Sequence, residues 1–333
     1  AGEERWPELA GDADPWVAWA ATRALAARQE DEGDPRASLE TIETLLGRLR
    51  GADLAGVHLL ELHLHRLQVL MSLGRYDRVV EACARAEALL DRILPSWGEF
   101  CRTTLQLEGA YCAVYLDPRP QTADELLKAL EPVDLPGTMR FIARSVRGEL
   151  ELTRGNARTA ALIQRMSLRC AGHWSSLLGA GSQWELYILS MCLVTDVELD
   201  ADDAAELDAA AVRARAVPLL RDILSDPAPR QRDIPTIMAF AAAVGLSVAA
   251  AEETGSDRRA AGVELVATAL AVGTNQTCRL LSRDYLRART ERVDARALAR
   301  AEERIGALDR ARLIARATGL ARDLAGGTGR DRG

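Results

Sequence analysis

The sequence predicts an all-α fold built from consecutive helical hairpins. Apolar residues recur at i, i+3, i+4 and i+7 through most of the 333 residues, whereas the alternating pattern of a β-strand is nearly absent. Short breaks containing Gly, Pro, Asp or Asn separate the periodic windows. The apolar content of 48%, with 27% charged residues, indicates a chain that can bury a core. Aromatics make up only 4%, so that core is expected to consist mainly of Ala, Leu and Val.

Helix-start signals support the periodicity. Asp14 precedes a first-turn proline, Asp202 and Asp203 open an Ala-rich window, and Asp257 is placed to cap another helix. We predict the Ala-rich window 234–252 to be a buried helix. The full set of expected helices is 14–30, 36–50, 54–73, 76–94, 97–115, 121–131, 137–153, 157–171, 174–194, 202–224, 234–252, 257–272, 276–290 and 294–325.

The turns between these helices repeat a pattern. The segment Leu73–Ala82 reads leucine, glycine, any residue, aromatic, acidic, then an apolar pair. The same layout returns around Gly155 and Gly255, and weaker versions occur around Gly33 and at 117–120. Glycine can adopt the positive φ that ends a helix, so we expect the chain to reverse at these positions.

This repeated pattern resembles the tetratricopeptide-repeat (TPR) family. The clearest match consists of Gly74, Tyr76, Val79, Cys83 and Ala86, and partial matches are Gly155, Ala160 and Ser167, and Gly255, Ala260 and Ala267. The first turns lie about 37 to 44 residues apart, whereas the standard repeat has 34. These longer units look like the TPR-like sensor regions of bacterial signalling ATPases and transcription regulators.

The resemblance implies a right-handed superhelix of about seven helix-turn-helix hairpins. It would form a single TPR-like solenoid over 1–325, with a candidate sub-boundary at the acidic insertion 196–206 and a flexible tail at 326–333. It also implies a non-catalytic protein- or ligand-binding module, the sensor or scaffold part of a bacterial regulatory system.

Composition excludes several other functions. The only lysine, Lys128, fits neither a P-loop nor a Schiff base. The net charge of −7 disfavours nucleic-acid binding by the whole chain. Residues 276–333 do carry 14 arginines against 8 acidic residues, but interleaved carboxylates favour ion pairing within the helix. A DNA-binding regulator that uses this segment stays an alternative. The cysteines are scattered along the chain, which indicates a cytoplasmic protein. No apolar run is long enough to predict a membrane span.

Two clusters suggest chemistry, and in each the structural interpretation is favoured. Asp202, Asp203 and Glu206 spell the DDxxE motif with which helical isoprenoid-type enzymes bind magnesium diphosphate. An acidic helix N-terminus explains the same residues, and such enzymes need an aromatic pocket. His58, His63 and His65 have spacings of five and two rather than the i, i+4 of a helical metal site, so we expect partly buried or groove-facing histidines. We predict no cofactor and no metal.

We predict that the binding residues lie in polar stripes on the first helix of some hairpins. Arg140, Arg144 and Arg147 share one helical face, and Arg279 and Arg283, followed by Arg287, share another. Such stripes suit an acidic peptide or a protein partner in a concave groove, although a solvated or ion-paired face explains them too. Aromatic residues with polar neighbours form a further candidate at Gln183, Trp184 and Tyr187, for which core packing is the alternative. A homodimer is left open.

Overall fold

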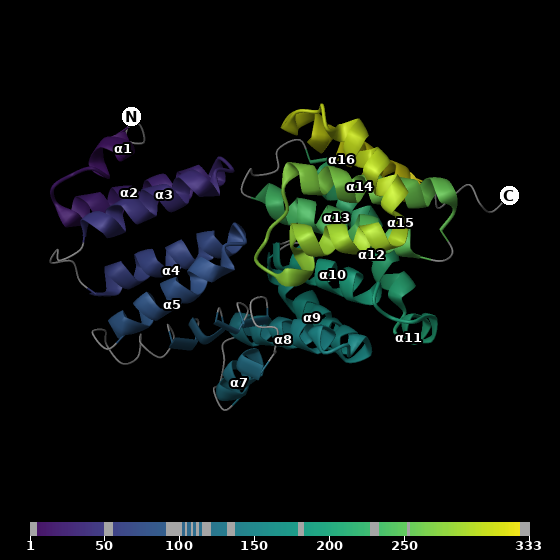
Figure 1. Cartoon of the computed structure of the whole chain (residues 1–333), viewed down its shortest axis with the longest axis horizontal. Coiled ribbons are helices and arrows are strands. Elements are labelled where there is room, and N and C mark those ends of the chain that lie inside the picture. The colour runs from purple at the N-terminus through teal and green to yellow at the C-terminus, as the bar shows by residue number, and fades with distance from the viewer. Residues whose placement is uncertain are drawn as a thin grey trace. The chain divides into compact units, whose positions relative to one another are not determined.

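The computed structural model describes residues 5–49, 56–90, 102–103, 105–107, 109–110, 113–114, 121–131, 137–178, 183–226, 233–251 and 254–326. Over these residues the regular structure is entirely helical, so the predicted all-α class is confirmed (Figure 1). The chain divides into two compact units, Ala1–Ala143 and Arg144–Gly333. The division falls inside α8 (Gly137–Thr153), and the acidic segment 196–206 lies within the second unit.

The first unit contains two stacked helical hairpins. Helix α2 pairs with α3, α4 pairs with α5, and α3 packs on α4 (Figure 1, purple to blue). Ala18, Leu45, Leu49 and Leu62 form a buried cluster that joins three of these helices. The helices of this unit that precede α8 are α1 (Trp6–Leu9), α2 (Pro15–Asp31), α3 (Pro35–Arg48), α4 (Gly56–Ser72), α5 (Tyr76–Leu90) and α7 (Gln121–Leu130).

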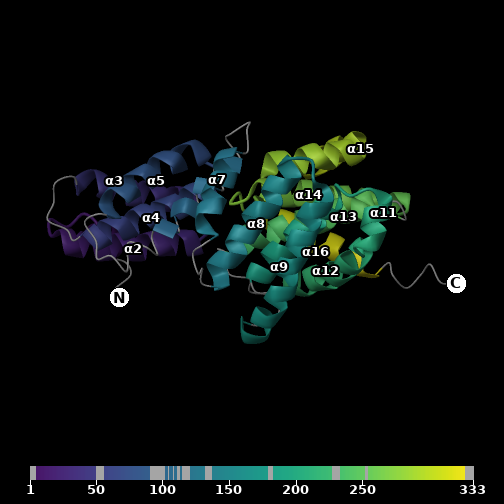
Figure 2. The same ribbon diagram turned by 90° about the horizontal axis from the view of Figure 1, so that it is seen from below.

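The second unit is organised around α13 (Ile234–Ala250), which α10, α12, α14 and α15 contact (Figures 1 and 2). Residues 237–249 of α13 are all buried, which confirms the predicted buried helix. Helix α16 packs on both α14 and α12, a contact between helices far apart in the sequence. The other elements are α9 (Ala157–Leu178), α10 (Gln183–Asp196), α11 (Ala201–Glu206), α12 (Ala209–Leu224), α14 (Ser256–Val272), η3 (Arg279–Leu281), α15 (Arg283–Ile305) and α16 (Arg310–Gly326).

Helices α13 and α14 approach closely because glycines face each other. A Cβ at Gly245 would lie 2.5 Å from the carbonyl oxygen of Gly262, and a Cβ at Gly262 would lie 2.6 Å from that of Gly245. Real Cβ atoms are not found at such distances, so only glycine fits at both positions. The absence of side chains at these two positions lets the two backbones pack closely.

Three of the predicted turn glycines have the expected conformation. The φ angles of Gly33, Gly74 and Gly155 are 82°, 67° and 85°. The prediction was wrong for Gly255, whose φ is −63°. Gly255 occupies the N-cap of α14, and a residue that starts a helix does not need the left-handed conformation that ends one. The weaker turn at 117–120 lies outside the described residues.

Some predicted helix boundaries were wrong where a polar residue caps a helix inside a continuous periodic window. The window 202–224 is divided at Asp208, whose φ of 52° is left-handed and whose carboxylate accepts a hydrogen bond from the amide of Ala211. The window 276–290 is divided at Ser282, which caps α15. Helix α15 then continues past the expected break near 291–293, and Asp294 introduces a kink. The predicted single helix 294–325 was wrong, because α15 ends at Ile305 and α16 begins at Arg310.

The remaining boundaries differ less. Helix α9 continues to Leu178 and α10 begins at Gln183, whereas the windows predicted a break near 172. The predicted helix 97–115 falls largely outside the described residues.

Candidate functional site

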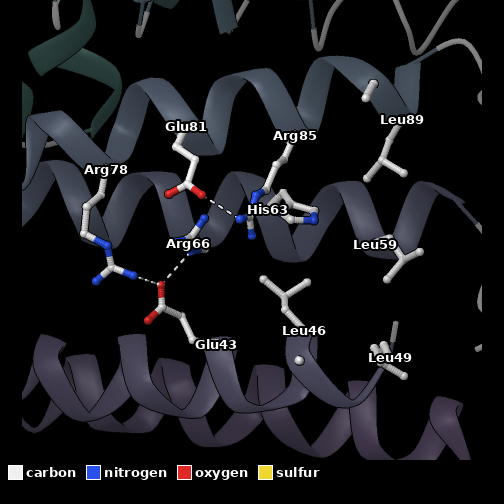
Figure 3. A pocket seen from close by; sticks show the side chains of 12 residues that line it. Glu43, Leu46, Leu49, Leu59, His63, Arg66, Arg78, Glu81, Arg85 and Leu89 are labelled. Carbon is white, nitrogen blue, oxygen red and sulfur yellow. Dashed lines mark hydrogen bonds and ion pairs between the residues drawn. The ribbon is translucent and has the colours of Figure 1, made fainter. Parts of the chain in front are cut away.

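Three helices of the first unit, α3, α4 and α5, enclose an open pocket of about 780 Å³ (Figure 3). One end is charged and the other is apolar. The polar residues that line it are Glu43, His63, Arg66, Arg78, Glu81 and Arg85, and the others are Leu46, Gly47, Leu49, Leu59, Ala88 and Leu89.

Helical periodicity places these side chains on three converging faces. On α4 the lining residues Leu59, His63 and Arg66 are spaced i, i+4 and i+7. The charged residues of α5 have the same kind of spacing, at 78, 81 and 85, and α3 contributes Glu43 and Leu46. Buried residues on other faces of the helices, among them Leu62 and Val79, hold the hairpins together. The pocket is therefore a gap between well-packed hairpins.

Arg66 is the distinctive residue of the pocket, because it is a buried cation with few partners. Only 4% of its surface is exposed. Its Nε donates a hydrogen bond of 2.7 Å to Oε1 of Glu43, and Nη2 of Arg78 donates to the same oxygen at 2.6 Å. Nη1 of Arg66 is buried and has no partner among the described residues. A buried donor without a partner is costly, so this atom points to a missing acceptor.

The electrostatics of the pocket follow from these contacts. Burial opposes ionisation of Glu43, but the hydrogen bonds from Arg78 and Arg66 outweigh it and lower the pKa of Glu43. Burial, aided by the charges of Arg66 and Arg85, lowers the pKa of His63 to about 4. The imidazole is therefore neutral at pH 7, and its buried Nδ1 has no partner among the described residues.

The arginine stripe of α8 lies on one helix, as predicted. Arg140 is exposed, whereas Arg144 and Arg147 are half-buried. Each of the three has an interaction partner, so none of them is a free cation.

The second predicted stripe was wrong as a single helical face. Arg279 lies in η3 and Arg283 begins α15, so the chain changes direction between them. The backbone amide of Arg279 donates to Oε2 of Glu149 at 3.1 Å, and that of Arg283 donates to Oε1 of Gln276 at 3.0 Å. Further along, Arg287 pairs with Glu291 and Glu302.

Other arginines of the basic C-terminal region are also paired. Arg289 contacts Glu198, and both Arg304 and Arg316 contact Glu264. These arginines form ion pairs within the second unit.

Of the aromatic candidates, Tyr187 is half-buried on α10, and its hydroxyl lies 3.3 Å from Oγ of Ser145. This contact fits the core-packing alternative. Gln183 and Trp184 open α10, and their side chains lie outside the described part of the structure.

The histidines occupy three different environments rather than one metal site. His58 packs against Trp16 and Trp19, and His65 lies 2.6 Å from Glu30. Only His63 faces the pocket. The described residues contain no group of three potential metal ligands.

The DDxxE carboxylates have an internal partner. Asp203 and Glu206 both pair with Arg158, and the distances from Nη1 and Nη2 to the Glu206 oxygens are 2.7 and 2.6 Å. These hydrogen bonds lower the pKa of Glu206 and raise that of Arg158. Asp203 and Glu206 therefore already hold a cation, the guanidinium of Arg158.

A buried carboxyl group also lies in the second unit. Glu149 is 1% exposed, and burial raises its pKa to about 8 despite the nearby Arg279. Its Oε2 accepts the amide hydrogen of Arg279, and Oε1 has no partner among the described residues. This contact attaches the η3 segment to α8.

Three arginines of this pocket were not predicted as site residues, namely Arg66, Arg78 and Arg85. A usable signal existed, because arginines at 78 and 85 and a histidine and an arginine at 63 and 66 share helical faces within one hairpin. That hairpin also carries the clearest TPR-like turn. What the spacing could not reveal is that Arg66 would be buried.

Comparisons with known proteins give no relative. No family model, no curated protein and no solved structure matches this chain. In the described part of the chain, no helix combines the length and the apolar character needed to cross a membrane.

Proposed function

We propose that the protein is a non-catalytic binding module, the sensor or scaffold part of a bacterial regulatory system, and that its pocket between α3, α4 and α5 takes an anionic ligand or partner segment. One observation carries this proposal. Arg66 is almost completely buried in the pocket, yet its Nη1 has no partner among the described residues.

The physical argument is the cost of such an arrangement. Moving a guanidinium out of water is unfavourable unless a counter-charge and hydrogen-bond acceptors replace the lost hydration. Glu43 provides one acceptor, and it is shared with Arg78. An anion in the pocket would supply the remaining acceptor and charge. Residues that reduce stability in this way are typical of functional sites.

A TPR-like repeat is part of the proposal. Gly74 ends α4 with a positive φ, and Val79, Cys83 and Ala86 are buried on the following helix, as such a repeat requires. Two hairpins stacked side by side, α2–α3 and α4–α5, agree with it. We propose that the right-handed superhelix of about seven hairpins extends this arrangement.

Ligand binding would act through the hairpins. An anion held by Arg66 on α4 and Arg85 on α5 would also lie against α3, because all three helices line the pocket. Binding that favours one arrangement of these helices would stabilise it by mass action and could expose or mask a partner surface.

The test uses the full chain and a fixed panel of probes. We would measure the shift in melting temperature on adding sodium octanoate, octyl phosphate, an octaglutamate peptide and octylamine. At least one anion should raise the melting temperature of the wild type and not that of Arg66→Met. The matched control is Arg154→Gln, since Arg154 pairs with Glu151 in the second unit and is not one of the lining residues. If no anion in the panel shifts the wild type, the proposed function is wrong.

A further inference from the structure

The pocket has two chemically different ends. Figure 3 shows Arg78, Glu43, Arg66 and Glu81 toward one end and Leu49, Leu59 and Leu89 toward the other. Resting on the function proposed above, we propose that the ligand is a small amphiphilic monocarboxylate, with one carboxylate at the Arg66 end and an unbranched or branched aliphatic body among the leucines.

The charge of the lining residues selects a monoanion. Three arginines line the pocket, and Glu43 and Glu81 are its only lining carboxylates among the described residues. Glu43 accepts hydrogen bonds from Arg66 and Arg78, while Glu81 pairs with Arg85 at 2.6 Å. One positive charge is left over, and the neutral His63 adds none. A phosphate monoester, with its charge of about −1.5 to −2 at pH 7, or a polyacidic peptide exceeds this balance.

The unpaired donors match the two oxygens of a carboxylate. Nη1 of Arg66 and Nδ1 of His63 are both buried and lack partners among the described residues. The two residues are three positions apart on α4 and line the same pocket, so they are neighbours on one face. In the tautomer protonated at Nδ1, the imidazole donates to one oxygen while the guanidinium donates to the other.

The apolar end and the volume favour a small molecule with an aliphatic body. Leu46, Leu49 and Leu59 belong to or pack on the hydrophobic cluster of the first unit, and Leu89 faces them from α5. The volume of about 780 Å³ lies within the range of roughly 300 to 1,000 Å³ typical of small-molecule pockets. An extended acidic peptide would leave the leucine end without a complementary group.

The experiment measures affinity by isothermal titration of the full chain with butanoate, hexanoate, octanoate and decanoate below their micellar concentrations. Affinity should rise about fourfold for each methylene until the leucine end is filled, because each one leaves water on binding. Octanol and octylamine should not bind. Arg66→Met should weaken octanoate binding roughly tenfold or more, and Arg85→Gln should weaken it less because its side chain is half-exposed. Arg154→Gln should leave it unchanged.

The outcomes separate this inference from the proposed function. If octaglutamate binds through Arg66 and the carboxylate series does not, the module binds an anion but the inferred ligand is wrong. A leucine-ended peptide that binds more tightly than octanoate, and loses binding when its terminus is amidated, would also overturn the inference in favour of a protein partner. Equal octanoate affinity in wild type and Arg66→Met would place binding elsewhere and reject it. If nothing binds, both proposals fail.

Discussion

Two buried arginines, one in each unit, illustrate how differently the same residue can be used. In the second unit Arg165 donates from Nη1 and Nη2 to the two oxygens of Asp196 at 2.6 and 3.0 Å, and from Nε to the carbonyl of Leu207 at 2.9 Å. In the first unit Arg66 donates from Nε to Glu43, while its Nη1 has no described partner.

Burial of an arginine therefore does not by itself define a binding site. Each nitrogen of the Arg165 guanidinium donates a hydrogen bond within the unit. The bidentate pair with Asp196 joins α9 to α10, and the Nε bond to Leu207 holds the turn between α11 and α12. Arg66 lines a pocket, so its incomplete hydrogen bonding lies beside the space that a ligand would occupy. The packing of the two units also differs. In the second unit, facing glycines let α13 and α14 approach closely, whereas the hairpins of the first unit leave a pocket between them.

The largest expected effect is that of Arg165→Met. Removing the guanidinium leaves the carboxylate of Asp196 buried without its partner, so the free energy of unfolding should fall by about 3–5 kcal/mol. Urea unfolding followed by circular dichroism measures it. A loss below about 1 kcal/mol would mean that this pair is no more structural than an exposed one.

Gly245→Ala tests the closed packing of the second unit. The added Cβ would meet the backbone of Gly262, so we expect the free energy of unfolding to fall by about 1–3 kcal/mol as the helices separate. Gly319→Ala, on α16, is the matched control because nothing lies within 4 Å of its Cβ position. It should raise stability by up to about 1 kcal/mol. Urea unfolding measures the effect of both substitutions on the free energy of unfolding. Equal effects of the two substitutions would contradict close packing of α13 on α14.

Glu149 should make the second unit less stable as the pH rises. Its pKa of about 8 in the folded chain exceeds the ordinary value of 4.5, so between these pH values the folded state binds more protons than the unfolded state. Stability then falls from pH 4.5 to 8 and levels off above. The melting temperature should differ less between pH 6 and pH 8.5 in Glu149→Gln than in the wild type, which thermal melts at the two pH values would measure.

His63 should give the opposite slope in the first unit. Its pKa of about 4 lies below the ordinary 6.5, so between these values the unfolded state binds more protons and stability falls as the pH is lowered. Melts of wild type and His63→Gln at pH 5 and 7.5 should show that the variant loses less stability in acid. Bound octanoate should reduce the same loss by compensating the charges of Arg66 and Arg85. An unchanged acid dependence in the variant would show that His63 is not the group responsible.

The smallest expected effect on stability is that of Arg66→Met. Glu43 keeps its contact with Arg78, and the methionine side chain fills the space of the arginine stem. We expect the free energy of unfolding to stay within about 1 kcal/mol of the wild type, while anion binding is lost. Urea unfolding measures the free energy of unfolding, and isothermal titration measures anion binding. A loss near that of Arg165→Met would make Arg66 a structural residue and break the comparison.

Much of the fold could be predicted, because helical periodicity is a local property. The windows at α3, α4 and α8 lie within two residues of the observed helices, and three positive-φ glycines fall at predicted turns. The missed boundaries at Asp208, Ser282 and Asp294 have a common reason. Each residue interrupts a helix through its own backbone conformation or capping, which an uninterrupted apolar stripe conceals.

The candidate site could be predicted only in part. The histidines were expected to be partly buried or groove-facing, and His63 does line a pocket. The arginine stripes were visible in the sequence because they are long and regular. Arg66 shares a helical face with His63, but this spacing did not show that Arg66 would be buried.

Local sequence patterns predict the all-α class, the glycine turns and the apolar faces, because these depend on neighbours three or four residues apart. Which buried charges find hydrogen-bond partners depends on the packing of helices in three dimensions. Arg66 and Arg165 both lie on helices with mixed faces, and their difference arises from residues 23 and 31 positions away, Glu43 and Asp196. Burial and pairing depend on which helices pack together, and that information is not local to either arginine.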